Sequence, residues 1–252
     1  MLSHERKREV LRHLRSHGIG QVNELAEAIG VSASTIRRDL KEMDSQGLLT
    51  RVHGGASLIE NDLEVAHMAR QSEHSAQKRR IGEAATSLVK DNSTILITGG
   101  TTTEAMLPFL HGRDGLTVLT NGLNVAVQLS RQANITVVVL GGILRHAEMS
   151  LLGPLAEHAM EEFRVDTAFT GTYGLDASVG LTGASVHEAS TDRKLLEGVG
   201  SLVVLADSTK FTQRGPVRLA SVEQIDVVIT DSGAPSSAVH ELRAGGVDVR
   251  LV

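Results

Sequence analysis

The clearest candidate for ligand chemistry is residues 99–103, which read Gly-Gly-Thr-Thr-Thr and follow a short β-branched run. The two glycines let backbone N–H groups approach an anion, and the three hydroxyls can donate hydrogen bonds to it. This combination is typical of a phosphate-binding segment. No Gly-Lys-Ser/Thr follows it and no Gly-x-Gly-x-x-Gly occurs in the chain, which excludes the common nucleotide-binding motifs. We call residues 99–103 the GGTTT loop.

Four further polar segments follow β-branched runs: 120–121, 141–145, 171–174 and 207–211. The carboxyl ends of parallel strands meet at one edge of a sheet, where open α/β folds bind ligands. Together the five segments predict one pocket, although a glycine in any single segment has the alternative role of shaping a turn. The predicted pocket residues in these segments are Gly99, Gly100, Thr101, Thr102, Thr103, Asn121, Gly141, Gly142, Arg145, Gly171, Tyr173, Asp207 and Lys210.

A second candidate site lies at residues 32–41, where hydroxyl and basic side chains share a helical pattern. Ile36, Leu40 and Met43 recur at helical spacing and predict a buried face. The outer face and its N-terminal cap then carry Ser32, Ser34, Thr35, Arg37, Arg38 and Lys41. Arginine bonds guanine edges, and hydroxyls bond bases or phosphates, so the pattern favours DNA recognition in the major groove. The alternative is a solvated face on which Asp39 and Glu42 pair with the basic residues.

The elements around this helix are those of a helix-turn-helix with a wing. Apolar spacing predicts helices over 3–17 and 22–29, and Gly30 ends the second one. The third helix ends near residue 46, and two short strands at 48–52 and 56–59 follow it as a hairpin. Arg51 and His53 at the tip of this hairpin are predicted to contact phosphates or a minor groove.

The rest of the chain alternates strands with helices. Strands are predicted at 94–98, 116–120, 135–140, 166–171, 201–206, 225–230 and 247–251, with a helix over 75–90 and helices between most of the strands. This alternation predicts a Rossmann-like α/β fold with a mostly parallel sheet. The predicted domains are 1–58 and 76–252, joined by a polar linker over 59–75.

Composition narrows the class of protein. The net charge is −5, but residues 1–58 hold nine Lys/Arg against seven Asp/Glu, and the remainder holds 16 against 23. A basic first module on an acidic body suggests that the first module faces a polyanion. Cysteine is absent, which excludes disulfides and thiolate chemistry. No apolar run is long enough to span a membrane and the N-terminus is charged, so we expect a cytoplasmic protein without membrane contact.

The strings ELAEAIGVSASTIRRDLKEM and GLLTRVHGGA resemble the N-terminal signature of DeoR-family bacterial transcriptional regulators. The resemblance covers nearly all of residues 3–58 and implies a winged helix-turn-helix that binds operator DNA. It assigns to the recognition-helix region the residues Ser32, Ser34, Thr35, Arg37, Arg38 and Lys41.

The GGTTT loop and the segments that follow the later strands resemble the sensor domain of the same family, over most of residues 75–235. That domain is similar to ribose-5-phosphate isomerase and usually senses a phosphorylated sugar. The resemblance implies that the GGTTT loop binds the phosphate. It implies that the rest of the pocket is lined by Asn121, Gly141, Gly142, Tyr173, Glu188 and Lys210.

A sugar-phosphate isomerase is the alternative function. Isomerisation needs a general base beside the substrate, normally a carboxylate. The isomerases that the second module resembles have an acidic run after the equivalent strand, where this chain reads Thr-Gly-Thr-Tyr-Gly at 170–174. We therefore predict a repressor of a carbohydrate operon, a homodimer or homotetramer, without catalytic residues or cofactor. His13 and His17 have the spacing of a zinc pair but no third ligand, so no metal site is predicted.

Overall fold

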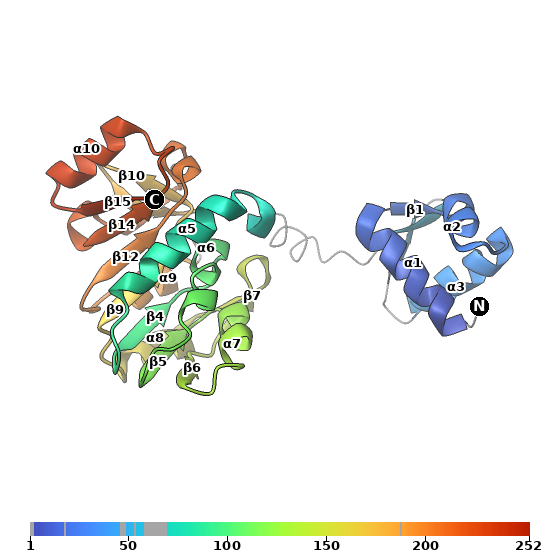
Figure 1. The fold of residues 1–252 in the computed structure, drawn as a ribbon, viewed down its shortest axis with the longest axis horizontal. Helices are drawn as coiled ribbons and strands as arrows, with labels where there is room; N and C mark the ends of the chain where they lie inside the picture. Colours follow the sequence, from blue (N-terminus) through green and yellow to red (C-terminus); the bar gives the residue numbers. More distant parts are fainter. Residues whose placement is uncertain (1–2, 18, 46–48, 53, 58–69, 187) are drawn as a thin grey trace. The chain divides into compact units, whose positions relative to one another are not determined.

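The chain forms two compact units, Met1–Val65 and Ala66–Val252, in a computed structural model (Figure 1). The structure describes residues 3–17, 19–45, 49–52, 54–57, 70–186 and 188–252. The predicted linker, 59–75, lies mostly outside these ranges, and its last part, residues 70–72, is a helical turn. Each unit is described separately below.

The first unit is a three-helix module with a small sheet. Its helices are α1 (Ser3–His17), α2 (Val22–Ile29) and α3 (Ala33–Ser45), as the apolar spacing predicts. Its strands are β1 (Ile19–Gln21), β2 (Thr50–Val52) and β3 (Gly55–Ser57), in the antiparallel order β1-β3-β2. The core packs Leu14, Leu25, Ile36, Leu40 and Met43 from all three helices. Helix α2 ends at Gly30, which adopts the left-handed conformation at φ 73° and donates its N–H to the carbonyls of the last turn.

The sequence predicts only that the first helix ends at residues 18–20, whereas the structure has a strand, β1, at Ile19–Gln21. Residues 19–21 pair with Gly55–Ser57 and so add a third strand to the hairpin. A three-residue strand is too short to show an alternating pattern, so the sequence gives no signal for it. The predicted residues 46, 48 and 58–59 lie outside the described residues.

The second unit is built on a seven-stranded sheet in which every neighbouring pair is parallel. Its strands are β4 (Thr94–Ile97), β5 (Leu116–Thr120), β6 (Ile135–Val139), β9 (Thr167–Thr170), β12 (Leu202–Leu205), β14 (Val227–Thr230) and β15 (Asp248–Leu251). They fall within the seven predicted strands, so the α/β prediction is confirmed. The order is β15-β14-β12-β9-β4-β5-β6. The chain therefore runs outward from β4 to β6 and then returns to the other side of β4, which makes the carboxyl ends of β4 and β9 the switch point where such sheets bind ligands.

Helices and short elements cover this sheet. The α-helices are α5 (Ser75–Ala85), α6 (Thr101–Glu104), α7 (Leu123–Leu129), α8 (Pro154–Glu161), α9 (Ala189–Leu196) and α10 (Ser236–Ala244). The 3-10 turns are η1 (Thr86–Leu88), η2 (Leu107–Phe109), η3 (His146–Glu148), η4 (Ser208–Thr212) and η5 (Val222–Gln224). The predicted helix over 75–90 therefore ends at Ala85, and η1 follows it. None of the described helices is long and apolar enough to cross a membrane.

Two small antiparallel sheets were not predicted. One pairs β7 (Ile143–Arg145) with β8 (Ser150–Leu152), and the other joins β10 (Gly174–Asp176), β11 (Gly180–Gly183) and β13 (Val217–Ala220). Their three- or four-residue strands include glycines and polar residues, which weaken any strand pattern. Both sheets matter for function because each begins or ends beside the cavity described below.

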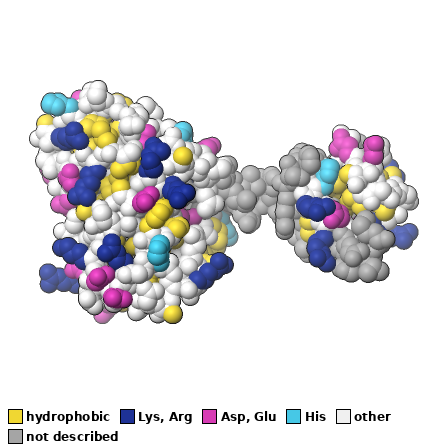
Figure 2. Space-filling view, viewed as in Figure 1, with side chains coloured by type: hydrophobic (Ala, Val, Ile, Leu, Met, Phe, Trp, Pro, Cys, Tyr) yellow, Lys and Arg dark blue, Asp and Glu magenta, His cyan; other side chains and the backbone are white. Residues whose placement is uncertain are grey.

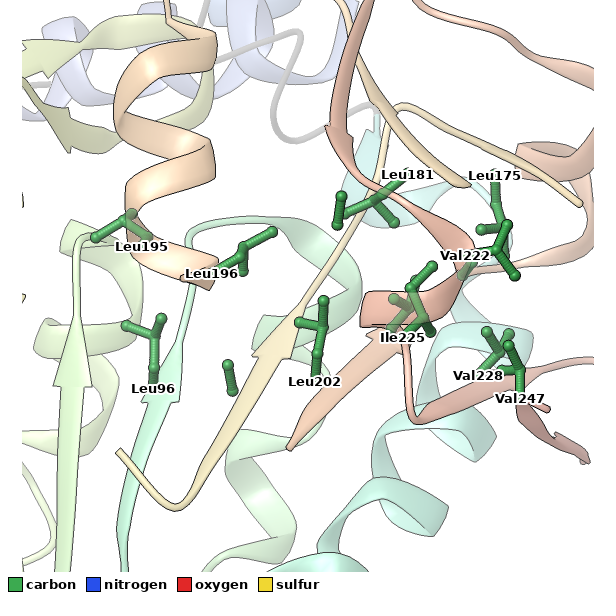
Figure 3. Close-up of a cluster of buried hydrophobic side chains, with 14 of the residues drawn as sticks. Leu96, Leu175, Leu181, Leu195, Leu196, Leu202, Val222, Ile225, Val228 and Val247 are labelled. Carbon is green, nitrogen blue, oxygen red and sulfur yellow. The ribbon is translucent and has the colours of Figure 1, made fainter. Parts of the chain in front are cut away.

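The large sheet separates two apolar cores. Along β4, Ile95 and Ile97 belong to one core and Leu96 to the other, as the two-residue period of a strand requires. The first core is closed by α5 and α7. The second is closed by α8, α9 and α10, and Figure 3 shows Leu195 and Leu196 of α9 beside Leu96. The sheet is thus buried on both faces, which leaves the strand ends as the edge where open α/β sheets bind ligands.

Candidate functional site

The N-terminus of α3 is fixed by hydroxyl groups. The Ser32 Oγ accepts the Thr35 N–H at 3.2 Å and lies 2.8 Å from the Thr35 Oγ1 and 2.9 Å from the Ser34 Oγ. This is a standard helix cap, and it holds all three predicted hydroxyls at the start of the helix. Ser32 and Ser34 are exposed, so the first turn is open to a ligand.

The basic side chains of α3 point away from the core. Arg37, Arg38 and Lys41 are exposed, whereas Ile36, Leu40 and Met43 are buried. The alternative interpretation, in which Asp39 and Glu42 neutralise these basic residues, is wrong in its pairing. Asp39 pairs with Arg6 at 2.5 Å and Glu42 pairs with Lys7 at 2.5 Å, both from α1. Among the described residues, no ion pair involves the three basic side chains.

The wing contributes one described basic residue. Arg51 on β2 is exposed, and its backbone N–H donates to the Asp44 Oδ1 at 3.3 Å, which ties the hairpin to the end of α3. His53, also predicted to contact DNA, lies outside the described residues. The first unit therefore presents one helix face and one strand whose basic side chains form no ion pair with another described residue.

The second unit has a cavity of about 600 Å³ at the carboxyl ends of its central strands. It brings together residues that follow β4, β5 and β12, residues at the end of β9 and after it, and residues of the small sheets. The predicted residues that line it are Gly99, Gly100, Thr101, Thr102, Asn121, Arg145, Gly171, Tyr173, Glu188, Asp207 and Lys210. They come from segments more than 100 residues apart, and the switch point in the sheet is what brings them to one place.

Three predicted residues do not line the cavity. Thr103 is fully buried, and its hydroxyl donates to the carbonyls of Thr98 and Gly100 at 2.8 and 2.7 Å. Gly141 and Gly142 form a left-handed turn before β7, at φ 74° and 121°. A Cβ on Gly142 would lie 2.4 Å from the Leu152 carbonyl oxygen, so close packing of the hairpin requires this glycine. These residues shape the loops instead of contacting a ligand.

The GGTTT loop is held by its neighbours. The Gly99 N–H donates to the Asn121 Oδ1 at 3.1 Å. Gly100 precedes α6 at φ 152°, a conformation that favours glycine. Helix α6 is a single turn, and the N–H groups of a first turn have no acceptor within their helix. The loop therefore presents backbone N–H groups and the Thr101 hydroxyl on the cavity side.

The prediction missed Lys78 of α5, which also lines the cavity. Its side chain is only 5% exposed, and its Nζ donates to the Thr101 Oγ1 at 3.1 Å and to the Arg70 carbonyl. Burial lowers the Lys78 pKa, although the Asp207 charge opposes this shift. A sequence signal existed: Lys78 falls on the same helix face as the buried Ile81 and Ala85, where a charged residue is unexpected.

A three-membered ion cluster forms another part of the cavity wall. The Arg145 Nη1 lies 3.0 Å from the Glu188 Oε2 and 3.4 Å from the Asp192 Oδ2, and its Nε donates to the Ser150 Oγ at 2.9 Å. Burial opposes the charge of Arg145, but the two carboxylates outweigh it and raise its pKa. Burial raises the pKa of Asp192, and Arg145 offsets part of that shift. Asp192 was not among the predicted residues.

The cavity wall carries charges of both signs. Its cationic side chains among the described residues are Arg70, Lys78, Arg145 and Lys210. Its carboxylates are Glu73, Glu148, Glu188, Asp192 and Asp207. Charged side chains of both signs are also mixed over the visible surface of this unit (Figure 2). Within the ranges that the structure describes, no group of three His, Cys, Asp or Glu residues could hold a metal ion.

Both units match known protein families. Residues 6–62 match the DeoR-like helix-turn-helix domain, and residues 73–232 match the DeoR C-terminal sensor domain. The chain belongs to the DeoR family of transcriptional regulators. The resemblance predicted from the sequence is therefore confirmed, and α2 and α3 lie within the residues that match the DeoR-like helix-turn-helix domain.

Several curated regulators are similar over the whole chain. The putative aga operon transcriptional repressor of Escherichia coli O157:H7 is 30% identical over 98% of this chain and 93% of that protein. The regulator GolR of Listeria innocua is 31% identical over 100% and 99%, and the glycerol-3-phosphate regulon repressor of Escherichia coli K12 is 30% identical over 98% of each. Among solved structures, ribose 5 phosphate isomerase A from Neisseria gonorrhoeae covers 53% of this chain and 52% of its own, with 18% identity and a TM-score of 0.40.

Proposed function

We propose that this DeoR-family regulator represses a carbohydrate operon and that a phosphorylated sugar in the cavity controls its affinity for operator DNA. The observation that carries the DNA-binding half is the pairing of two acidic residues of α3, Asp39 and Glu42, with α1. It leaves Arg37, Arg38 and Lys41 available to DNA. Two of the similar proteins are named as repressors, which supports repression as the direction of control.

In this proposal the first turn of α3 enters the major groove. Ser34 and Thr35 contact phosphates or base edges, and Arg38 bonds a guanine edge. Arg51 contacts the neighbouring backbone. A single module of this size covers a short site, so specific binding needs two modules on paired half-sites. We infer that the protein acts as a homodimer or homotetramer, with contacts supplied by the second unit.

The effector half of the proposal rests on Lys78 and the GGTTT loop. Lys78 is buried, and among the described residues no carboxylate lies within ion-pair distance of its ammonium. Its Nζ bonds a carbonyl and a hydroxyl, and the charges of Asp207 and Glu73 act on it without direct contact, so an anionic ligand bonded to the ammonium would offset the cost of its burial. A phosphate on the GGTTT loop would supply that charge, and Lys210 would add a second cation.

The alternative of an isomerase is not favoured by the residues at the end of β9 or by two of the five cavity carboxylates, Glu188 and Asp207. The segment after β9, residues 170–174, contains none. Glu188 is bonded to Arg145, and the Asp207 Oδ1 accepts the Thr209 N–H at 3.1 Å. Neither has the freedom of a general base. The purified protein should show no isomerase turnover on pentose or hexose phosphates. Turnover that co-purifies with the protein and is lost in Glu188→Gln would overturn the non-enzymatic interpretation.

The experiment that tests the proposal is a gel-shift titration on DNA from upstream of the neighbouring operon, at fixed salt. The protein should bind this DNA specifically, and one phosphorylated sugar from a panel should release it. The unphosphorylated sugars should have no effect. Specific binding that no phosphorylated sugar changes would overturn the effector half alone. Binding with no preference over unrelated DNA would overturn the DNA-binding half.

A further inference from the structure

We propose that the effector is a phosphorylated sugar with a free amino group, whose ammonium binds between Glu188 and Asp192. This inference rests on the proposed function, because it names the chemical class of the ligand for the same cavity. It concerns the end of the ligand away from the phosphate.

The first argument is the sharing of one cation by two carboxylates. Glu188 and Asp192 approach the same nitrogen of Arg145, its Nη1, at 3.0 and 3.4 Å. The Nε of that guanidinium is already bonded to Ser150. Arg145 therefore neutralises one carboxylate, and one negative charge remains at this part of the wall. The pKa of Asp192 is consistent with this remaining charge: burial raises it, and the charge of Arg145 offsets only part of the shift.

The second argument is the balance of charge around the rest of the cavity. The described lining has five carboxylates against four cationic side chains, although it is proposed to bind an anion. Arg70 pairs with Glu148 at 3.3 Å, and Lys78 and Lys210 lie near the charges of Asp207 and Glu73. The surplus carboxylate is therefore at the Arg145 cluster. The phosphate of a sugar without an amino group would leave this carboxylate uncompensated, whereas the ammonium of an amino sugar would pair with it.

The third argument is position. Ser150 accepts from Arg145, and a Cβ on Gly99 would lie 3.0 Å from the Ser150 Cβ, so Ser150 stands between the GGTTT loop and the ion cluster. Arg145 thus connects Ser150, which lies beside the GGTTT loop, to the two carboxylates. In this arrangement a hexose phosphate has its phosphate on the GGTTT loop and a ring substituent at Glu188 and Asp192.

A hydroxyl group in place of the amine would donate a hydrogen bond to either carboxylate but would bring no charge. Hydrogen bonds between charged partners are roughly twice as strong as neutral ones. An acetylated amine keeps one N–H donor and loses the charge, and it is also bulkier. The free amine, the hydroxyl and the acetamide therefore form a series that separates charge from hydrogen bonding.

The test is a set of binding titrations of the full-length protein at pH 7. The ligands are glucosamine 6-phosphate and galactosamine 6-phosphate, their hydroxyl counterparts glucose 6-phosphate and galactose 6-phosphate, and the two N-acetyl forms. At least one free amino sugar phosphate should bind about tenfold more tightly than its hydroxyl and N-acetyl counterparts. Asp192→Asn should remove most of this preference, and Glu188→Gln provides a second variant if the first does not fold. Asp248→Asn, on β15 and outside the cavity lining, should keep it.

Three outcomes overturn the inference in different ways. If the hydroxyl or N-acetyl sugar phosphates bind as tightly as the amines, the proposed function stands and the amino-group inference fails. If none of the phosphorylated sugars binds, both fail. A preference for the amines that survives unchanged in both the Asp192 and the Glu188 variants would place the ammonium elsewhere and would also overturn it.

Discussion

Arg6 of α1 bonds both carboxylate oxygens of Asp39 in α3, with its Nε 2.5 Å from Oδ2 and its Nη2 3.1 Å from Oδ1. Asp39 is 2% exposed, so the pair is largely shielded from water. An acidic residue in the middle of a DNA-reading helix would repel phosphates if it faced outward. Its pairing with Arg6 places that charge inside the module and fixes the rotation of α3 against α1.

The first prediction concerns the outer face of α3. Arg38→Ala should weaken operator binding by about 1–3 kcal/mol and relax specificity at one base position, if Arg38 bonds a base edge. A gel-shift or fluorescence-anisotropy titration at matched salt measures the loss. The charge-matched control is Arg250→Ala, a half-buried arginine on β15, which should leave operator affinity unchanged. Wild-type affinity in the Arg38 variant would remove this residue from the recognition surface.

Much of the fold follows from local sequence patterns. The seven parallel strands lie within runs of five or six residues that are rich in β-branched side chains and alternate with helical segments. Strands that are buried on both faces give this sequence signal clearly. The helices of the first unit show strong apolar spacing and glycine ends. Strands β1, β7 and β8 have three residues each, and their pairing depends on partners distant in the chain, so no local pattern marks them.

Residues of the cavity could be predicted from the sequence only where a polar residue or a glycine follows a predicted strand. The GGTTT loop, Asn121 and Asp207 follow strands directly, so the rule on strand ends finds them. Lys78 and Asp192 lie within helices. A charged residue on the apolar face of α5 marks Lys78 as unusual, but it does not show that α5 reaches the cavity, and no comparable pattern marks Asp192. Gly142 is the opposite case. It follows a strand and was therefore predicted to line the cavity, but it lies outside the cavity lining, and close packing against Leu152 accounts for a glycine at this position.

The second prediction concerns the contact between α5 and α6. A Cβ on Gly82 would lie 2.5 Å from the Ala105 carbonyl carbon and 2.6 Å from the Met106 N, both backbone atoms. Alanine is favoured over glycine within a helix by about 1 kcal/mol, whereas overpacking costs about 1–3 kcal/mol or more. Gly82→Ala should therefore lower the unfolding temperature of the second unit. Calorimetry measures it, and the exposed neighbour Glu83→Ala is the control. An unchanged or higher unfolding temperature would contradict this packing.

The third prediction concerns the pH dependence of the loop that carries Lys210. Asp231 is buried, which favours its protonated form. However, its oxygens accept the N–H groups of Ser208 at 2.7 Å and Gly233 at 3.0 Å, and the pKa of Asp231 lies below its ordinary value of 3.8. The ionised carboxylate therefore stabilises the fold above that pH, and the stabilisation is lost as the pH falls through the lower folded pKa.

Asp231→Asn replaces one accepting oxygen with an amide that faces an N–H donor. The variant should lose about 1–3 kcal/mol of unfolding free energy at pH 7. Denaturant titrations at pH 7, 5 and 3 measure the difference from the wild-type protein, which should be similar at pH 7 and 5 and smaller at pH 3. A difference that does not change over this range would mean that the charge of Asp231 has no part in the stabilisation.

The fourth prediction uses the single tyrosine of the chain. Tyr173 lines the cavity and is 47% exposed, and the sequence contains no tryptophan. Binding of the correct sugar phosphate should therefore change the intrinsic fluorescence of the protein, with a midpoint equal to that of operator release. Tyr173→Phe should abolish the signal while calorimetry still detects binding. A ligand that releases the operator without any change in tyrosine emission would indicate a site outside this cavity.

The last prediction concerns the switch itself. Lys210 and Thr102 line the cavity, where the ammonium can neutralise a phosphate and the hydroxyl can donate to its oxygens. An effector acts only if it binds the DNA-competent and DNA-incompetent arrangements with different affinity, by typically about 1–3 kcal/mol. Lys210→Ala and Thr102→Val should therefore abolish the response to the sugar phosphate and leave operator binding without effector nearly intact. Gel shifts with and without effector separate the two properties. If both variants respond at wild-type effector concentrations, the GGTTT loop is not the phosphate site.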